Sequence, residues 1–372
     1  MSKSNIDHYE FHHREEHSDS ALNVTDGVES QPIVNPYFKR VKRRTLSTEE
    51  YVKGILEGNI TILSQAITLI ESNNRDHYAQ AQEIIERCLP YSGKSMRIGI
   101  TGVPGAGKST FIEAVGGMVT DLGHKLAVLA IDPSSERTGG SILGDKTRME
   151  TICNNPKVFI RPSPSAGSLG GVARKTRESI VLCEAAGFDV IFIETVGVGQ
   201  SETAVHSMVD IFMLLQISGA GDELQGIKRG IMEMADVVAI TKADGDNRHR
   251  AELARAQIFN ALKLFPPTES EWTPQVLTCS SLSGKGIGDV WNTVEDFIRH
   301  TKENGFFHAN RNRQGKYWMY ESINESLKAG FYGNPAIAER LACYEEAILS
   351  DKISSFIAAK ELLDLYQTLS KE

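Results

Sequence analysis

Short apolar runs alternate with longer segments of helical periodicity through the middle of this chain, from Met96 to about His300. Such alternation is typical of βαβ units and a parallel sheet. The runs are hydrophobic along nearly their whole length, which indicates strands buried on both faces. The predicted strands are 97–101, 126–131, 158–161, 190–194, 211–217, 237–241 and 275–279. The pattern therefore predicts an α/β domain built on a mostly parallel, doubly wound sheet.

Helical segments flank this sheet on both sides. Ser47 and Glu50 can form a capping box that starts a helix, and apolar residues then recur at helical spacing as far as Pro90. Apolar positions recur again beyond residue 311, around Trp318, and this face needs either the N-terminal helices or a second subunit to cover it. Residues 1–44 are polar and carry few large apolar side chains, so they predict a flexible arm. We divide the chain into a polar arm (1–44), an N-terminal helical segment (45–93), the sheet domain (94–305) and a C-terminal helical segment (306–372).

Composition narrows the functional classes. The 372 residues are 41% hydrophobic, and the net charge of -8 works against a general nucleic-acid or membrane-surface role, because both partners are polyanions. The five cysteines are far apart and form no CxxC pair, which fits reduced thiols. The first residues lack the apolar stretch of a signal peptide, and no apolar run is long enough to span a bilayer. We therefore expect a cytoplasmic protein.

A phosphate-binding loop is the clearest motif. The stretch Gly102-Val103-Pro104-Gly105-Ala106-Gly107-Lys108-Ser109-Thr110 lies between a predicted strand and a predicted helix, as a P-loop requires. In such a loop the backbone amides point at the phosphates, and the helix N-terminus adds partial positive charge. Lys108 can reach the β and γ oxygens, and Ser109 can ligate Mg²⁺. The motif predicts a P-loop NTPase that uses Mg²⁺.

Two acids end predicted strands, at the edge where a parallel sheet gathers its ligands. Asp132 follows the second strand and Glu194 ends the fourth, so both should face the phosphate loop. Glu194 to Gly197 occupies the place of the Asp-x-x-Gly motif of switch GTPases, in which the acid holds Mg²⁺ through water and the glycine amide senses the γ-phosphate. The loop 133–149 is rich in glycine and hydroxyls and carries Asp145, which is typical of a switch loop.

Two further motifs favour guanine over adenine. Thr241-Lys242-Ala243-Asp244 resembles the Asn-Lys-x-Asp motif, in which the aspartate accepts hydrogen bonds from guanine N1 and N2 that adenine does not offer. Ser280, Ser281 and Leu282 follow the last strand, where GTPases place a loop beneath the base. Thr241 is the weak point, because Asn would bridge to the phosphate loop through its amide and Thr has only a hydroxyl.

On these residues the sequence resembles the methylmalonyl-CoA mutase-associated GTPases, the G-protein chaperones of a cobalamin-dependent mutase. Further stretches that carry the resemblance are Asp132-Pro-Ser-Ser, Gly144-Asp-Lys-Thr-Arg-Met149, Glu194-Thr-Val-Gly-Val-Gly-Gln-Ser-Glu202 and Gly221-Asp-Glu-Leu-Gln-Gly-Ile-Lys-Arg-Gly230. It runs from about Leu46 to the end of the chain.

This resemblance implies a GTPase that gates the delivery of adenosylcobalamin to the mutase and protects that enzyme, and it implies a homodimer formed through the C-terminal helices. It also implies that Asp132, Asp145 and Glu194 belong to the Mg²⁺ and switch machinery, and that Lys228 approaches the nucleotide from a third switch. Val198 stands where Ras-like GTPases place a water-orienting Gln. We therefore expect slow intrinsic hydrolysis that a partner accelerates.

Three other functions are compatible with parts of the sequence. A GTP-dependent metallochaperone for nickel enzymes draws support only from four histidines within residues 8–17. An ATP-dependent small-molecule kinase would have no use for Asp244. A scaffold that holds GTP without hydrolysing it would show no phosphate release with any partner.

Overall fold

The computed structural model describes residues 46–72, 74–131, 149–162, 169–195, 201–219 and 229–369. Its centre is a seven-stranded sheet in the order β3-β2-β4-β1-β5-β6-β7, and every strand pairing is parallel. The strands are β1 (Met96–Gly102), β2 (Leu126–Ile131), β3 (Val158–Pro162), β4 (Val190–Thr195), β5 (Ile211–Ile217), β6 (Val237–Thr241) and β7 (Gln275–Thr278). The α/β fold class predicted from the apolar runs is confirmed.

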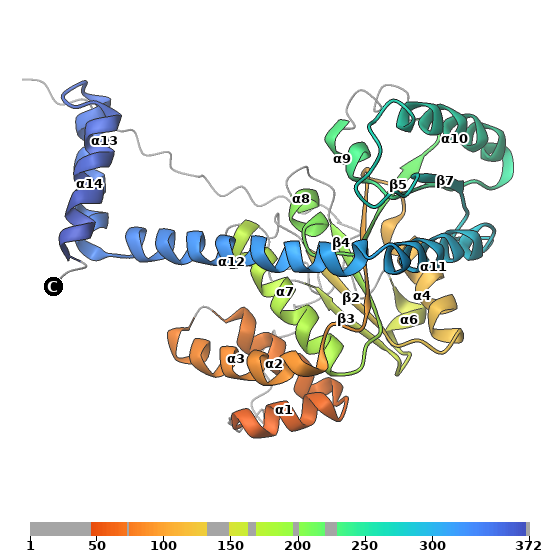
Figure 1. Ribbon diagram of the computed structural model, residues 1–372, viewed down its shortest axis with the longest axis horizontal. Helices are drawn as coiled ribbons and strands as arrows, with labels where there is room; N and C mark the ends of the chain where they lie inside the picture. The colour runs from red at the N-terminus through yellow and green to blue at the C-terminus, as the bar shows by residue number, and fades with distance from the viewer. Residues whose placement is uncertain are drawn as a thin grey trace, which may run out of the picture. The chain divides into compact units, whose positions relative to one another are not determined.

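Helices cover both faces of this sheet (Figure 1). One face packs against α7 (Leu169–Ala185) and α8 (Ser201–His206), and the other against α4 (Lys108–Asp121), α6 (Glu150–Cys153) and α11 (Ile287–Glu303). Alternate residues of β2 point to opposite faces of the sheet. Ala127 and Leu129 lie in the core on the α7 side, and Val128 lies in the core on the α4 side. Near β6, α9 (Arg229–Met234) and α10 (Arg248–Leu262) enclose a third apolar cluster.

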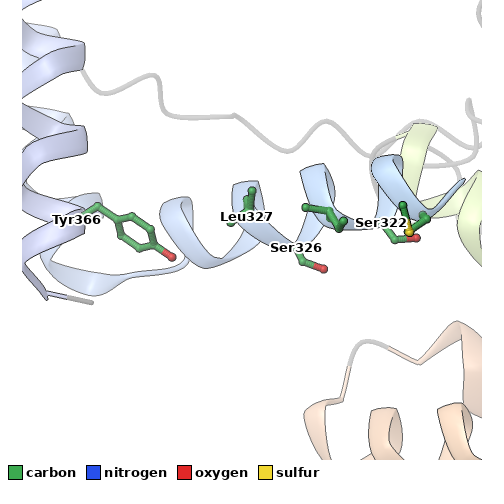
Figure 2. Close-up of a pocket in the computed structure, with 6 residues that line it drawn as sticks. Ser322, Ser326, Leu327 and Tyr366 are labelled. Carbon is green, nitrogen blue, oxygen red and sulfur yellow. The ribbon is translucent and has the colours of Figure 1, made fainter. Parts of the chain in front are cut away.

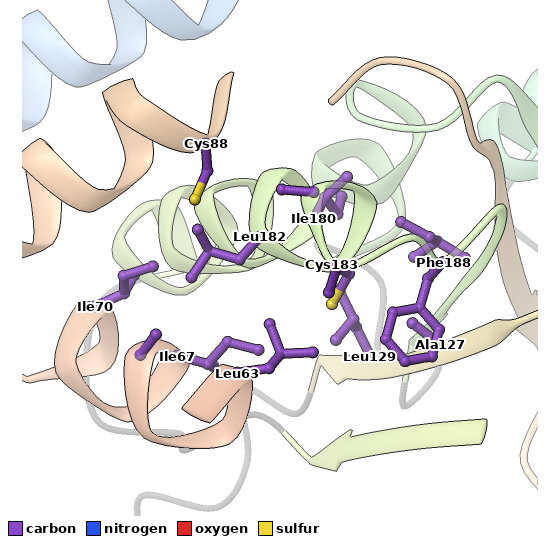
Figure 3. Close-up of a cluster of buried hydrophobic side chains, with 14 of the residues drawn as sticks. Leu63, Ile67, Ile70, Cys88, Ala127, Leu129, Ile180, Leu182, Cys183 and Phe188 are labelled. Carbon is purple, nitrogen blue, oxygen red and sulfur yellow. The ribbon is translucent and has the colours of Figure 1, made fainter. Parts of the chain in front are cut away.

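Three N-terminal helices pack outside α7: α1 (Thr48–Leu56), α2 (Ile60–Glu71) and α3 (Arg75–Cys88). The predicted capping box is present, because the Ser47 side chain accepts from the Glu50 amide and the Glu50 carboxylate accepts from the Ser47 amide. Gly58, with φ of 73°, separates α1 from α2. Figure 3 shows Leu63 of α2, Leu182 of α7 and Leu129 of β2 within one buried cluster. This cluster joins the N-terminal helices to the sheet.

The C-terminal region begins with α12 (Phe306–Tyr332), which is anchored at the amino ends of β1 and β5. Arg311 forms a 2.6 Å ion pair with buried Asp210 and donates to the carbonyls of Gly93 and Ser95. Trp318 Nε1 donates to the Ser207 carbonyl at 3.0 Å. Beyond α12, α13 (Pro335–Leu349) and α14 (Ser355–Leu369) pack on each other, and α13 contacts α12 (Figure 1).

Candidate nucleotide site

The phosphate loop connects β1 to α4 at the carboxyl edge of the sheet. Gly102 lies so close to β5 that a Cβ there would meet the Leu215 carbonyl oxygen at 2.5 Å, so only glycine fits. Gly107 has φ of 80° and is the N-cap of α4, and no side chain caps this helix. The first-turn amides of α4 therefore remain available to an anion, as a phosphate site requires.

The remaining residues of the loop differ in their exposure to solvent. Ala106 is buried, and its amide donates to the Val103 carbonyl at 3.1 Å, which closes the turn. Pro104 and Gly105 are exposed. Ser109 is half-buried and Thr110 is exposed, both in the first turn of α4. The hydroxyl of Ser109 is the kind of hard oxygen donor that Mg²⁺ prefers.

Lys108 lies between the phosphate loop and two buried acids. Its Nζ donates to the Gly102 carbonyl at 2.9 Å. Burial lowers the pKa of Lys108, while the negative charges of Glu194 and Glu202 oppose that effect. Glu194 lies near the end of β4, is 8% exposed, and is close enough for its charge to act on Lys108 of the phosphate loop. Its carboxylate adds oxygen donors that suit Mg²⁺.

Glu202 is a further acid near the phosphate loop, and the sequence motifs assign it no role. It belongs to α8, is 2% exposed, and acts electrostatically on Lys108. The buried Glu202 carboxylate therefore balances part of the charge of the half-buried Lys108 ammonium. The sequence indicates a role for Glu202 only through its place at the end of the Glu194-to-Glu202 stretch. A single acid at the start of a helix is otherwise typical of the surface.

The segment 241–245, the base loop, starts at the end of β6 and is joined directly to the phosphate loop. The Thr241 hydroxyl donates to the Ala106 carbonyl at 2.7 Å and lies 3.0 Å from the Gln216 carbonyl. The link to the phosphate loop that was expected of an Asn amide is thus made here by the Thr241 hydroxyl. Lys242 Cε lies 3.9 Å from the position of a Cβ on Gly107, so the lysine stem lies alongside the phosphate loop.

The loop after β7 supports the base loop from the other side. The Ala243 amide donates to the Cys279 carbonyl at 3.0 Å, and the hydroxyl of fully buried Ser280 donates to the Asp244 carboxylate. Ser281 is half-buried, whereas Leu282 is 85% exposed and its side chain points to solvent. Ser280 therefore orients Asp244, and Leu282 can offer a ligand little more than its backbone.

Four residues named from the sequence lie outside the described residues: Asp132, Asp145, Gly197 and Lys228. The same holds for Val198 and for the arm, residues 1–44. Among the residues that the structure does describe, there is no group of three His, Cys, Asp or Glu side chains that could hold a metal ion. Within the same residues, no helix is long and apolar enough to cross a membrane.

Comparison with known proteins identifies the family. The family model described as methylmalonyl-CoA mutase-associated GTPase MeaB matches residues 63–336 of this chain. This span includes the phosphate loop, the base loop and the loop after β7. The chain belongs to the MeaB family. As a member of this P-loop GTPase family, the protein binds GTP and hydrolyses it.

Individual relatives agree with this assignment. This MeaB-family chain is 48% identical over 308 residues to a Mycobacterium tuberculosis protein named "Probable GTPase", covering 83% of this chain and 92% of that one. It is 46% identical over 325 residues to the mouse protein "Methylmalonic aciduria type A homolog, mitochondrial", covering 85% and 78%. Among solved structures, one titled "Crystal structure of LAO/AO transport system kinase" matches with a TM-score of 0.68 and 36% identity, over 86% and 97% of the two chains.

Proposed function

We propose that this MeaB-family GTPase is a chaperone of methylmalonyl-CoA mutase or a related cobalamin mutase, and that its nucleotide cycle gates cofactor loading and protects the loaded enzyme. The observation that carries the proposal is the family match across residues 63–336. The name of the mouse relative, which refers to methylmalonic aciduria, supports it. Adenosylcobalamin belongs to the partner enzyme in this scheme, and GTP and Mg²⁺ belong to this chain.

In the proposed site, Lys108 and the amides of the phosphate loop bind the phosphates, and Asp244 binds the Watson–Crick edge of guanine. Ser280 and Thr241 support this assignment, because one orients the Asp244 carboxylate and the other joins the base loop to Ala106. Hydrogen bonds to a polar edge discriminate strongly, since a wrong base leaves a buried acceptor unpaired. GTP rather than ATP is therefore the substrate that the geometry favours.

The proposed Mg²⁺ ligands are Ser109 and Glu194 together with Asp132 and Asp145. The metal would neutralise charge on the phosphates and fix the geometry of the attacking water. Ser109 and Glu194 supply oxygen donors on the phosphate-loop side of the sheet, and their chemistry fits a hard cation. Gly197 and Lys228 complete the proposal as parts of the second and third switches, and Val198 accounts for slow hydrolysis until a partner engages.

We also propose that the protein acts as a homodimer through its C-terminal helices. Met319, Ile323 and Leu327 recur every fourth residue on α12 and are 51%, 47% and 59% exposed, so they form one apolar face. Leu327 and Tyr366 of α14 line one hollow of about 440 Å³, and Figure 2 shows these two side chains. Ile323→Glu should shift the sedimenting species from dimer to monomer, and Asn324→Glu on the same helix is the charge-matched control. A monomeric unmodified protein would contradict this part of the proposal.

Affinity capture from native extract tests the partner. The bait is the full chain loaded with GDP or with a non-hydrolysable GTP analogue, and Lys108→Ala serves as the nucleotide-binding control. We expect a cobalamin mutase in the eluate and a faster GTP hydrolysis rate when that mutase is added back. A urease or hydrogenase subunit in its place would favour the nickel metallochaperone, and equal affinity for ATP and GTP in calorimetry would favour the kinase.

A further inference from the structure

The base loop contains two residues in the left-handed backbone region, Lys242 with φ of 57° and Gly245 with φ of 48°. Glycine adopts this conformation freely, but it is unfavourable for a lysine because its Cβ crowds the backbone. Such a residue keeps the conformation only where its surroundings hold it. Whatever holds the Lys242 carbonyl in place therefore also sets the direction of the chain into Asp244.

Asn247 provides that contact. Its side-chain Nδ2 donates to the Lys242 carbonyl at 2.7 Å, and its backbone amide donates to the Asp244 carbonyl at 3.0 Å. Its Oδ1 accepts from the Ser218 hydroxyl at 2.6 Å. Ser218 directly follows β5, so one side chain joins the base loop to the end of a neighbouring strand.

The chemistry of these partners fixes the orientation of the Asn247 amide. A backbone carbonyl can only accept, so the NH₂ group must face Lys242 and the oxygen must face Ser218. A carboxylate at this position would set an oxygen against the Lys242 carbonyl and would lose the donor. The site therefore distinguishes Asn from Asp, two side chains of nearly equal size.

We propose that Asn247 is a positioning residue for guanine recognition: by holding the Lys242 turn it places the Asp244 carboxylate where the N1 and N2 hydrogens of the base arrive. The inference rests on the proposed role of Asp244 in base binding. Asn247 itself lies three residues beyond Asp244 and acts through the backbone of the loop. Ser280 holds the Asp244 side chain from the loop after β7, so Asn247 and Ser280 constrain the same carboxylate from two directions.

Calorimetric titration with GDP and with inosine 5′-diphosphate, which lacks the 2-amino group, tests the proposal on the full chain. We expect Asn247→Ala and Asn247→Asp to weaken GDP binding on the order of tenfold or more and to reduce the GDP preference over the inosine nucleotide. Ser218→Ala should act in the same direction with a smaller effect. Asp246→Asn, a same-size change on the same exposed turn, is the matched control and should stay within about twofold.

Steady-state hydrolysis separates positioning from general destabilisation. Asn247 makes its contacts around the base loop, so the variants should raise KM for GTP and retain kcat at saturation. A lower melting temperature with an unchanged ratio of GDP to inosine-nucleotide affinity would overturn the inference. Asp244→Asn separates the role of Asp244 from that of Asn247. If Asp244→Asn also leaves the ratio of GDP to inosine-nucleotide affinity unchanged, Asp244 does not bind the base. If Asp244→Asn abolishes the GDP preference and the Asn247 variants do not, only the role of Asn247 fails.

Discussion

Replacing Thr241 with valine tests whether the base loop holds the phosphate loop in place. Valine has nearly the same shape as threonine but lacks the hydroxyl that donates to the Ala106 carbonyl at 2.7 Å. Thr241 is 2% exposed and Ala106 is 1% exposed, so water has little access to replace the lost donor. The variant therefore leaves the packing nearly intact and removes one link between two nucleotide-binding loops.

The magnitude follows from the partners of the hydroxyl. Leaving a buried carbonyl without its donor costs about 1–3 kcal/mol. Gln216 and Thr241 lie on the paired strands β5 and β6, so the sheet holds the Gln216 carbonyl in place even without the hydroxyl. Ala106 belongs to a loop and depends more on this contact. Since about 1.4 kcal/mol is a factor of ten in affinity, we expect GDP and GTP to bind about 5–150 times more weakly.

Titration of each variant with GDP measures the effect, and urea unfolding measures stability separately. Thr241→Ser keeps the hydroxyl and should bind GDP within about threefold of the unmodified protein. Thr278→Val is the matched control on β7, because the Thr278 hydroxyl bonds only the exposed Glu252 carboxylate among the described residues. Unchanged GDP affinity and an unchanged urea midpoint in Thr241→Val would refute the proposed link.

Three further predictions concern charged residues. Lys108→Ala should weaken triphosphate binding on the order of a hundredfold in calorimetry, and unchanged affinity would remove Lys108 from the phosphate site. Arg311→Ala leaves Asp210 buried without its ion-pair partner and should lower the free energy of unfolding by about 3–5 kcal/mol, against at most about 1 kcal/mol for exposed Arg313→Ala. Burial raises the pKa of Asp236 from 3.8 to about 7. The folded state therefore holds this proton longer than the unfolded state, and stability falls as pH rises from about 4 to 7. Asp236→Asn should be more stable than the unmodified protein at pH 8, by about 4 kcal/mol at most, and should lose the advantage below pH 4.

The sheet was predictable because its signal is local. Continuous apolar runs such as that of β5 have few alternatives once glycine-rich turns bound them. The phosphate loop is predictable for the same reason, because its strand, glycines, lysine and helix follow each other directly along the chain. The capping box of Ser47 and Glu50 was predicted for the same reason, because both partners of the hydrogen bonds lie within one turn.

The remaining features depend on contacts between distant segments. Thr241 and Ala106 are 135 residues apart, and no pattern around either one shows that a hydroxyl can make the bridge of an amide. Glu202 reads as an ordinary first-turn acid until the fold buries it near Lys108.

The loops expected to hold the nucleotide and the segments expected to signal its state follow different strands. The phosphate loop, the base loop and the loop after β7 follow β1, β6 and β7, and they are joined by the hydrogen bonds of Thr241, Ala243 and Ser280. The segments expected to act as switches follow β2, β4 and β5 instead. Because the joined loops constrain one another, substitutions in them should change affinity for GDP and GTP together. A variant that alters partner response at constant nucleotide affinity should therefore map to the segments after β2, β4 or β5.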